Sequence, residues 1–406
     1  MSSITHQSPP FNGLSSVQLK DGAILDGFGR LRVSDPVGVF ESTLTYDKQP
    51  RLWNEAVSGM ATSTHRPLES AVDMIVQASG DLVIRQTKNY FRYQPGKSQL
   101  IFFTFAFGNG DPNVRKRIGY FDTQNGMFFE EINGSIWVVL RSNVTGTVVD
   151  TRIAQADWNI DIFSELDLTK SQIGILDLEW LGVGRVRMGF VQNGQIRYVY
   201  QFLNANTQSS VYITSAQLPV RVQIEATNLP AAPCTMKQIC AAVMSEGGQD
   251  QERGFPFTAF TDPSSFITVS AVRPILSIRP KTTFNGIVNR TPMINQRVEA
   301  YTNLNGARVD IVYNGTLTGA SWVSVADDSV MEYDRSATVI ASGTIIQSFY
   351  IFSQNAGLSR VSESIIGRLP VTLDIDGVNP TILSVVVTNI SGNAAMAGIM
   401  SWQEYL

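Results

Sequence analysis

The sequence predicts an all-β protein: an antiparallel β-sandwich or jelly-roll domain, then a second β-sandwich domain, preceded by an extended N-terminal arm. Turn dipeptides are frequent, because Asn-Gly occurs eight times and Asp-Gly three times. These dipeptides supply the positive φ angles that tight hairpins require. Between them lie short runs rich in Val, Ile, Phe, Tyr and Thr, a spacing typical of all-β folds rather than of strand and helix alternation.

The length and texture of the chain predict its domain boundaries. A chain of 406 residues is expected to form two or three domains of roughly 100 to 200 residues each. Residues 1–45 carry turn dipeptides and isolated apolar residues, which build little core, so we expect an extended arm there. A polar, Gly-rich and Pro-containing stretch near residue 250 indicates a linker over 251–265. The jelly-roll domain would then span residues 46–250 and the second sandwich residues 266–406.

Two runs in the first domain predict strands directly. Residues 100–108, LIFFTFAFG, are apolar on both faces, which favours a central strand buried from both sides. Residues 120–142 contain Asn-Gly turns at Asn125 and Asn133, which predicts an antiparallel meander. Three runs in the second domain also alternate as strands do: residues 307–315, 344–353 and 380–390.

The segment 235–248, TMKQICAAVMSEGG, fits two structures. Its apolar residues follow helical spacing, and Thr235 and Gln238 could form a capping box at the start of a helix. Alternate residues of the same segment are also apolar, as in a strand. Both alternatives remain open at this point.

The hairpin over residues 186–200 can be tested for register. A two-residue loop at Asn193 and Gly194 would place Phe190 opposite Arg197 and split the apolar residues between two faces. A three-residue loop, with Gly194 left-handed in a bulge, keeps them on one face and is therefore predicted. The pairs it predicts are Phe190 with Ile196, Met188 with Tyr198 and Val186 with Tyr200.

Composition and charge exclude several classes of function. Charged residues make up 16% of the chain, below the roughly 25% of an average domain, so neutral polar groups or other protein chains must cover the surface. The net charge of −4 gives no general reason to bind nucleic acid, and the basic run NVRKRIGY at 113–120 is interpreted as a solvated loop. No apolar run approaches the ~20 residues of a membrane span and no secretory signal is evident, so we expect neither a membrane partner nor secretion.

Metal and cofactor chemistry is not expected. The chain has two cysteines, Cys234 and Cys240, too few for a disulfide framework. Its two histidines, His6 and His65, lie far from the cysteines in sequence, which argues against a His/Cys metal cluster. The nucleophile motif G-x-S-x-G is absent.

The stretch ILDLEWLG, residues 175–182, carries two acids on one side of a strand. Asp177 and Glu179 share a face because strand side chains alternate, and paired carboxylates about 5 to 5.5 Å apart are what a retaining glycosidase uses. The stretch resembles the E-x-D-x-E strand of the laminarinase and lichenase type of β-glucanase. The resemblance implies a concanavalin-like β-jelly-roll for residues 46–250.

The same resemblance argues against catalysis. By position, Glu179 matches the acid/base of that family and Asp177 the supporting carboxylate, whereas Ile175 stands at the nucleophile. Isoleucine cannot attack an anomeric carbon, so the family's mechanism cannot run. An active β-glucanase would need another acid, such as Glu130 or Glu131.

Tryptophans beside these acids suggest a binding function. Aromatic rings stack on sugars, although in sandwiches they are more often core; the four considered are Trp137, Trp158, Trp180 and Trp322. Asp177, Glu179 and Trp180 are therefore the candidate glycan contacts. An exposed Trp180 beside the two acids would favour glycan binding, whereas burial of both acids in a hydrogen-bonded network would favour a scaffold.

A wider resemblance covers about residues 20–250. It is carried by DGFGRLRVSDP (26–36), YQPGKSQLIFFTF (93–105), KRIGYFDTQNGMFFE (116–130), LEWLGVGRVRMGF (178–190) and MSEGG (244–248). These motifs resemble a family of structural proteins encoded by tailed bacteriophages and some large DNA viruses. The resemblance implies a virion component and no catalytic residues.

The expected function is therefore a non-enzymatic structural component of a virus particle, on the capsid exterior, the tail or a fibre. We expect it to self-associate with closed symmetry, as a trimer, and to dock on other virion proteins through residues 1–45. The alternative is a jelly-roll protein of the virion that recognises host surface glycans.

Overall fold

The computed structural model describes residues 5–7, 16–18, 36–248, 254–262, 264, 266–352, 359–364 and 369–406. It divides into two compact units, one formed by residues 1–50, 55–86 and 93–249 and the other by residues 51–54, 87–92 and 250–406. Within the described residues, the single helical segment is the 3-10 turn η1 (Gln155–Asp157). The predicted all-β class is confirmed, and among the described residues no helix is long and apolar enough to cross a membrane.

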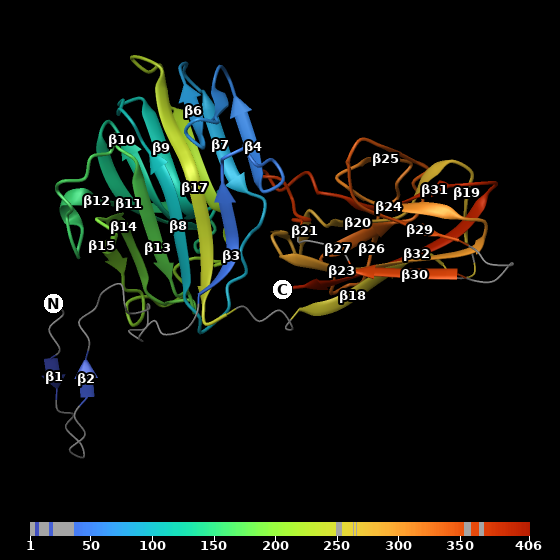
Figure 1. Cartoon of the computed structure of the whole chain (residues 1–406). Coiled ribbons are helices and arrows are strands. Elements are labelled where there is room, and N and C mark those ends of the chain that lie inside the picture. Colours follow the sequence, from blue (N-terminus) through green and yellow to red (C-terminus); the bar gives the residue numbers. More distant parts are fainter. Residues whose placement is uncertain are drawn as a thin grey trace. The chain divides into compact units, whose positions relative to one another are not determined.

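The first unit is a two-layered antiparallel β-sandwich of jelly-roll type (Figure 1). One layer has seven strands in the order β12 (Val149–Ala154), β11 (Ser135–Ser142), β10 (Gly126–Ile132), β9 (Val114–Phe121), β16 (Val220–Ala226), β7 (Leu82–Thr87) and β4 (Trp53–Ser58). The other has eight: β15 (Gln195–Phe202), β14 (Val186–Gln192), β13 (Gln172–Leu178), β8 (Gln99–Ala106), β17 (Cys234–Glu246), β6 (Ala71–Val76) and β5 (Thr62–Arg66), with β3 (Pro36–Thr43) also paired with β17. Strand β16 thus lies between β9 and β7, and strand β17 lies between β8 and β6. The last strands of this unit are therefore central in both sheets.

Aromatic side chains join the two layers in the core. Phe129 of the seven-stranded sheet stacks on Phe190 of the eight-stranded sheet, with ring centroids 4.6 Å apart. It also meets Phe103 of β8 edge-on at 6.3 Å. All three rings are buried, so the apolar runs of the sequence supply the interior of the sandwich.

The expected arm ends earlier than its predicted limit. Residues 36–43 form β3, which pairs along β17 from Glu246 to Cys240, and so belong to the body rather than to the arm. Most of residues 1–35 lie outside the described residues; within them β1 (Thr5–Gln7) pairs with β2 (Ser16–Gln18).

The local strand predictions fare differently. The meander is confirmed, because β9, β10 and β11 pair in succession. Strand β8 is central, between β13 and β17, but Phe102, Thr104 and Ala106 are only half-buried, so burial from both sides is wrong for that part. The segment 235–248 adopts the strand alternative, as β17.

The predicted three-residue hairpin loop is wrong. Gln192 pairs with Gln195, so the loop is Asn193 and Gly194, both with positive φ, and Phe190 faces Arg197. The register then shifts between Met188 and Gly189. This bulge on the β15 strand brings Met188 opposite Tyr200 and Val186 opposite Phe202. A bulge in the strand, rather than a longer turn, thus places these apolar residues on one face.

The second unit is another β-sandwich, as predicted, but it begins within the expected linker. β18 (Phe255–Phe260) pairs with β32 at the edge of its sheet. Its Phe and Thr residues favour a strand, and an edge strand tolerates Pro256. The five-stranded sheet contains β18, β32 (Ala394–Glu404), β23 (Met293–Leu304), β30 (Ser359–Ser364) and β19 (Ile267–Val269). The six-stranded sheet runs β26 (Val323–Ser324), β27 (Met331–Asp334), β20 (Val272–Pro280), β31 (Leu383–Asn389), β24 (Ala307–Tyr313) and β29 (Thr344–Ile351).

Minor ribbons complete this unit: β21 (Thr283–Phe284) with β22 (Ile287–Val288), and β25 (Thr316–Thr318) with β28 (Val339–Ala341). Its core lies between the two larger sheets. Val298 and Trp402 of the five-stranded sheet pack with Val309 and Val385 of the six-stranded sheet. The unit therefore has its own hydrophobic core.

Candidate functional site

The two acids of the D-x-E stretch lie on and just after β13 in the eight-stranded sheet. Strand alternation places Ile175 and Asp177 on one face and Leu176 and Leu178 on the other. All four are buried. Ile175 and Asp177 are therefore not open to solvent, although Ile173, on the same face, is 39% exposed.

Asp177 is held by three side chains from other strands or loops. Its carboxylate accepts hydrogen bonds from Ser98 Oγ at 2.8 Å and Tyr198 Oη at 3.0 Å. Arg187 approaches with Nε at 3.2 Å and with Nη2 in a short ion pair. The Arg187 guanidinium lies 4.3 Å from the centroid of the Tyr198 ring. Asp177 and Arg187 are each only 1% exposed, so this is a buried, charge-paired network.

The position of the missing nucleophile is part of an apolar cluster. Ile175 packs with Leu100 and Tyr198, and half-buried Ile196 and Met244 lie against them. A carboxylate in this cluster would be buried among apolar side chains. Position 175 is therefore part of the apolar packing of this face.

Glu179 and Trp180 begin the loop that follows β13. Glu179 is fully buried, and its N–H donates to the Arg185 carbonyl at 3.2 Å. Trp180 is half-buried; its Nε1 donates to the Ile213 carbonyl at 3.3 Å, and its ring meets Tyr93 edge-on at 6.1 Å.

The three candidate glycan contacts are mostly enclosed by the fold. Asp177 and Glu179 are buried, and half-buried Trp180 donates a hydrogen bond to the Ile213 carbonyl. Burial of both acids is the arrangement expected of a scaffold. Glycan contact at these three residues stays a prediction.

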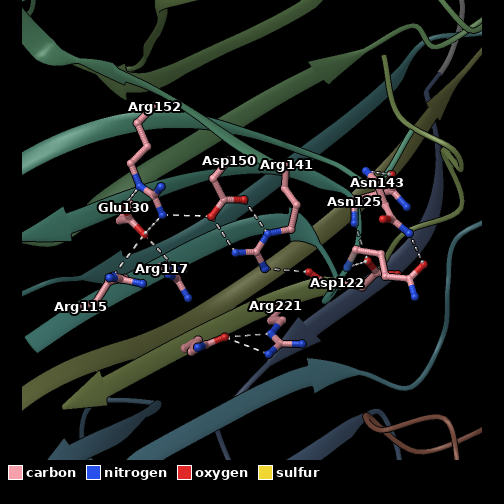
Figure 2. A network of polar contacts seen from close by, with 12 residues as sticks. Arg115, Arg117, Asp122, Asn125, Glu130, Arg141, Asn143, Asp150, Arg152 and Arg221 are labelled. Carbon is pink, nitrogen blue, oxygen red and sulfur yellow. Dashed lines mark hydrogen bonds and ion pairs between the residues drawn. The ribbon is translucent and has the colours of Figure 1, made fainter. Parts of the chain in front are cut away.

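A second polar network, missed by sequence reasoning, covers the outer face of the seven-stranded sheet (Figure 2). The basic run 113–120 is not a solvated loop but strand β9. Its Arg117 donates through Nε to the Glu130 carboxylate at 2.7 Å, and Arg152 of β12 donates to the same carboxylate at 2.6 Å. Arg115 adds a third cation, 3.7 Å away. Glu130 is fully buried beneath these guanidinium groups.

The network continues along the sheet through Asp150. Arg141 binds Asp150 through two hydrogen bonds of 2.8 and 2.9 Å, and Arg152 bridges to Asp150 at 3.0 Å. The Arg141 guanidinium also lies 5.2 Å from the centroid of the Phe128 ring. Cations stacked on phenylalanine rings therefore close this face without a covering helix.

Burial and ion pairing act in opposite directions on these carboxyls. Burial alone would raise the pKa of Glu130, but hydrogen bonds from Arg152 and Arg117 outweigh it and lower that pKa. The same competition, resolved by Arg141, lowers the pKa of Asp150. Both acids are ionised at neutral pH and act as structural anions.

Glu130 and Glu131 cannot complete a catalytic pair with Asp177. They lie on β10 of the seven-stranded sheet, whereas Asp177 lies on β13 of the eight-stranded sheet. Glu131 is itself buried and forms an ion pair of 3.2 Å with buried Lys116. The replacement nucleophile considered from sequence is therefore not supplied by either residue.

Metal ligands do not gather in the part of the chain that the structure describes. Cys234 and Cys240 are free thiols. Of the four tryptophans considered from sequence, Trp158 is buried and the other three are half-buried; Trp322 is covered by the Arg279 guanidinium at 4.1 Å from its ring centroid.

Comparison with known proteins gives only distant likenesses. No family model and no curated protein matches the chain. A protein of unknown function from Shewanella oneidensis is 8% identical, with 52% of this chain and 88% of that chain covered and a TM-score of 0.34. A glycosyl hydrolase family 16 protein from Mycobacterium smegmatis is 9% identical, with 51% and 100% covered and a TM-score of 0.36. The Bacillus licheniformis β-glucanase is 8% identical, with 52% and 99% covered and a TM-score of 0.32. No conclusion about activity follows from scores of this size.

Proposed function

We propose that this protein is a non-enzymatic structural component of a virus particle, which self-associates and docks on other virion proteins. The observation that carries the non-enzymatic part is the buried network around Asp177. Ser98, Tyr198 and Arg187 engage Asp177, the carboxylate at the supporting position, and Ile175 stands where the nucleophile would be. These residues hold strands together instead of facing a substrate.

The virion part of the proposal is supported by the sequence motifs over residues 20–250 and by the texture of the chain. Its charged content is low, at 16%, which suits a surface that other chains cover. A rigid two-sheet body with an N-terminal segment ahead of it suits a subunit that binds its neighbours through that segment. A closed homo-oligomer, with a trimer as the expected form, is part of the proposal.

Removal of residues 1–35 is expected to abolish incorporation into particles while leaving a folded body. The cut must stop before Pro36, because β3 pairs with β17 over seven residue pairs and its loss would damage the eight-stranded sheet. Incorporation is measured by quantitative mass spectrometry of gradient-purified particles, and folding by circular dichroism and thermal unfolding of the isolated chain.

A chain lacking only residues 1–4 serves as the control for this deletion. The proposed docking role predicts that the control enters particles at the normal level. Normal incorporation of a folded chain that lacks residues 1–35 would refute that role.

Host-glycan recognition is the second candidate function. The buried acids Asp177 and Glu179 do not favour it. Two exposed aromatic side chains of the second unit, Tyr350 and Phe352, do favour it.

A further inference from the structure

One end of the six-stranded sheet exposes a row of side chains on the face opposite its core. Register pairs Val272 with Thr388, Thr388 with Arg308, and Arg308 with Tyr350. Directly paired residues of neighbouring strands point to the same face. Ala307 and Ile351, one position away along the strands, belong to the core. The row therefore lies on the outer face and crosses four adjacent strands.

A second row adds to the same surface. Phe352 follows Tyr350 by two residues, and its ring lies over Gly306, where an added Cβ would be only 2.8 Å from a ring carbon. Ile390 lies on the other side, with its N–H bonded to the Gly306 carbonyl at 3.1 Å. A residue with a side chain at position 306 would displace the Phe352 ring. The bare backbone of Gly306 is what lets that ring lie across the neighbouring strand.

The two aromatic rings form a platform. Tyr350 is 59% exposed and Phe352 is 58% exposed. Their planes are nearly parallel, at 14°, with centroids 6.2 Å apart, a separation that indicates laterally displaced rings rather than a face-to-face stack. Large aromatic side chains are normally buried in sandwiches. Two parallel rings left half in water offer a flat apolar surface to a ligand.

A polar pair stands beside the platform. Arg308 binds Asp310 through Nε at 3.0 Å and Nη2 at 2.9 Å, and Ser348 Oγ donates to the other carboxylate oxygen at 2.6 Å. The Arg308 side chain is still 40% exposed, so part of its fork of donors faces outward. Next to it, the Thr388 hydroxyl oxygen is buried with no hydrogen-bond partner among the described residues. The outward donors of Arg308 thus border the rings, whereas the Thr388 hydroxyl lies beneath the surface.

We propose that this surface, formed by Tyr350, Phe352 and Arg308, binds a neutral glycan chain. The C–H faces of pyranose rings stack on aromatic faces, while a few fixed polar groups orient the ligand through its hydroxyls. Nucleobases also stack on aromatic rings, but their phosphates require clustered cations, and the charge of Arg308 is balanced by Asp310. Glycan binding at this surface does not depend on the proposed role in a virus particle.

Affinity electrophoresis of the full chain tests the proposal. The protein is run in native gels containing laminarin, xylan or dextran, each against a gel without polysaccharide. At least one neutral polysaccharide should retard the wild-type chain, and the double substitution Tyr350→Ala with Phe352→Ala should reduce the retardation at least tenfold in apparent affinity. Arg308→Gln should weaken it by a smaller factor.

Ile345→Ala is the matched control, because Ile345 is an equally exposed apolar residue of the same strand. It should leave the retardation unchanged, and thermal unfolding should show that all variants are folded. Absence of retardation by every polysaccharide, or equal retardation of the double variant, overturns the proposal. So does loss of self-association in the double variant without any change in retardation, because the rings would then be a contact between copies of the chain.

Discussion

Replacement of Glu130 by glutamine is expected to lower the free energy of unfolding by about 3–5 kcal/mol at pH 7. The Glu130 carboxylate is fully buried and bonded to Arg117 and Arg152 at 2.7 and 2.6 Å. Glutamine keeps the shape of the side chain but removes its charge, which takes from the buried Arg117 guanidinium the nearer of its two carboxylate partners. Urea unfolding followed by tryptophan fluorescence measures the difference.

The same variant should respond less to acid. The pKa of Glu130 is lowered in the folded protein, so its ionised form contributes stability that is fully present above the unfolded pKa of about 4.3 and is lost as the pH falls through the folded value. Wild-type stability should therefore fall more steeply below about pH 4 than that of Glu130→Gln. Glu165→Gln, at an exposed ion pair with Arg197, is the control and should change little. Equal stability of wild type and Glu130→Gln would show that the network does not stabilise the sheet.

The second large effect is expected at the network around Asp177. Asp177→Leu and Arg187→Met should each cost about 3–5 kcal/mol, because each leaves the partner charge buried without its counter-ion. The double variant should lose clearly less than the sum, since neither charge of this buried pair then remains. Urea unfolding of the wild type, the two single variants and the double variant gives this coupling directly.

This cycle distinguishes a scaffold from a functional site. Residues kept for ligand binding often destabilise the fold, and their replacement is neutral or stabilising. A loss of stability in both single variants supports a scaffold role for Asp177 and Arg187. Single variants as stable as the wild type would indicate that Asp177 and Arg187 serve a ligand instead, and the control Leu203→Ala, at an exposed position, sets the scale of a neutral change.

The sequence predicted the fold best where structure is local. The Asn-Gly dipeptides at Asn125 and Asn133 define the meander on their own, because the positive φ angles of Gly126, Asn133 and Gly134 set the turns. The prediction of the hairpin loop at Asn193 was wrong. The apolar residues do need to share one face, but a bulge in β15 brings this about instead of a longer loop.

The polar networks were harder to predict because their members are distant in sequence or lie on different strands. The exception is the pairing of Arg117 with Glu130 and Lys116 with Glu131, which follows from the register of the β9–β10 hairpin. Extending the predicted meander by pairing opposite residues would have revealed it. The interpretation of residues 113–120 as a solvated loop considered their charge alone.

The aromatic platform of the second unit left no such signal. Tyr350 and Phe352 occupy alternate positions of a strand, a pattern shared with buried rings. Only the register of β29 against β24, and the bare Gly306 beneath Phe352, place both rings on the outer face. Exposure of a side chain depends on which neighbouring strands cover it, and one strand's sequence does not contain that information.

The central claim is that this protein is a structural component of a virus particle. Immunogold electron microscopy on intact particles purified from the source, with antibody against the recombinant protein, tests it most directly. The account predicts regular labelling at a fixed place on the particle: on the head for a capsid-exterior subunit, or at the tail or its tip for a tail or fibre subunit. Particles that carry no label, even after gentle disruption, would contradict the account.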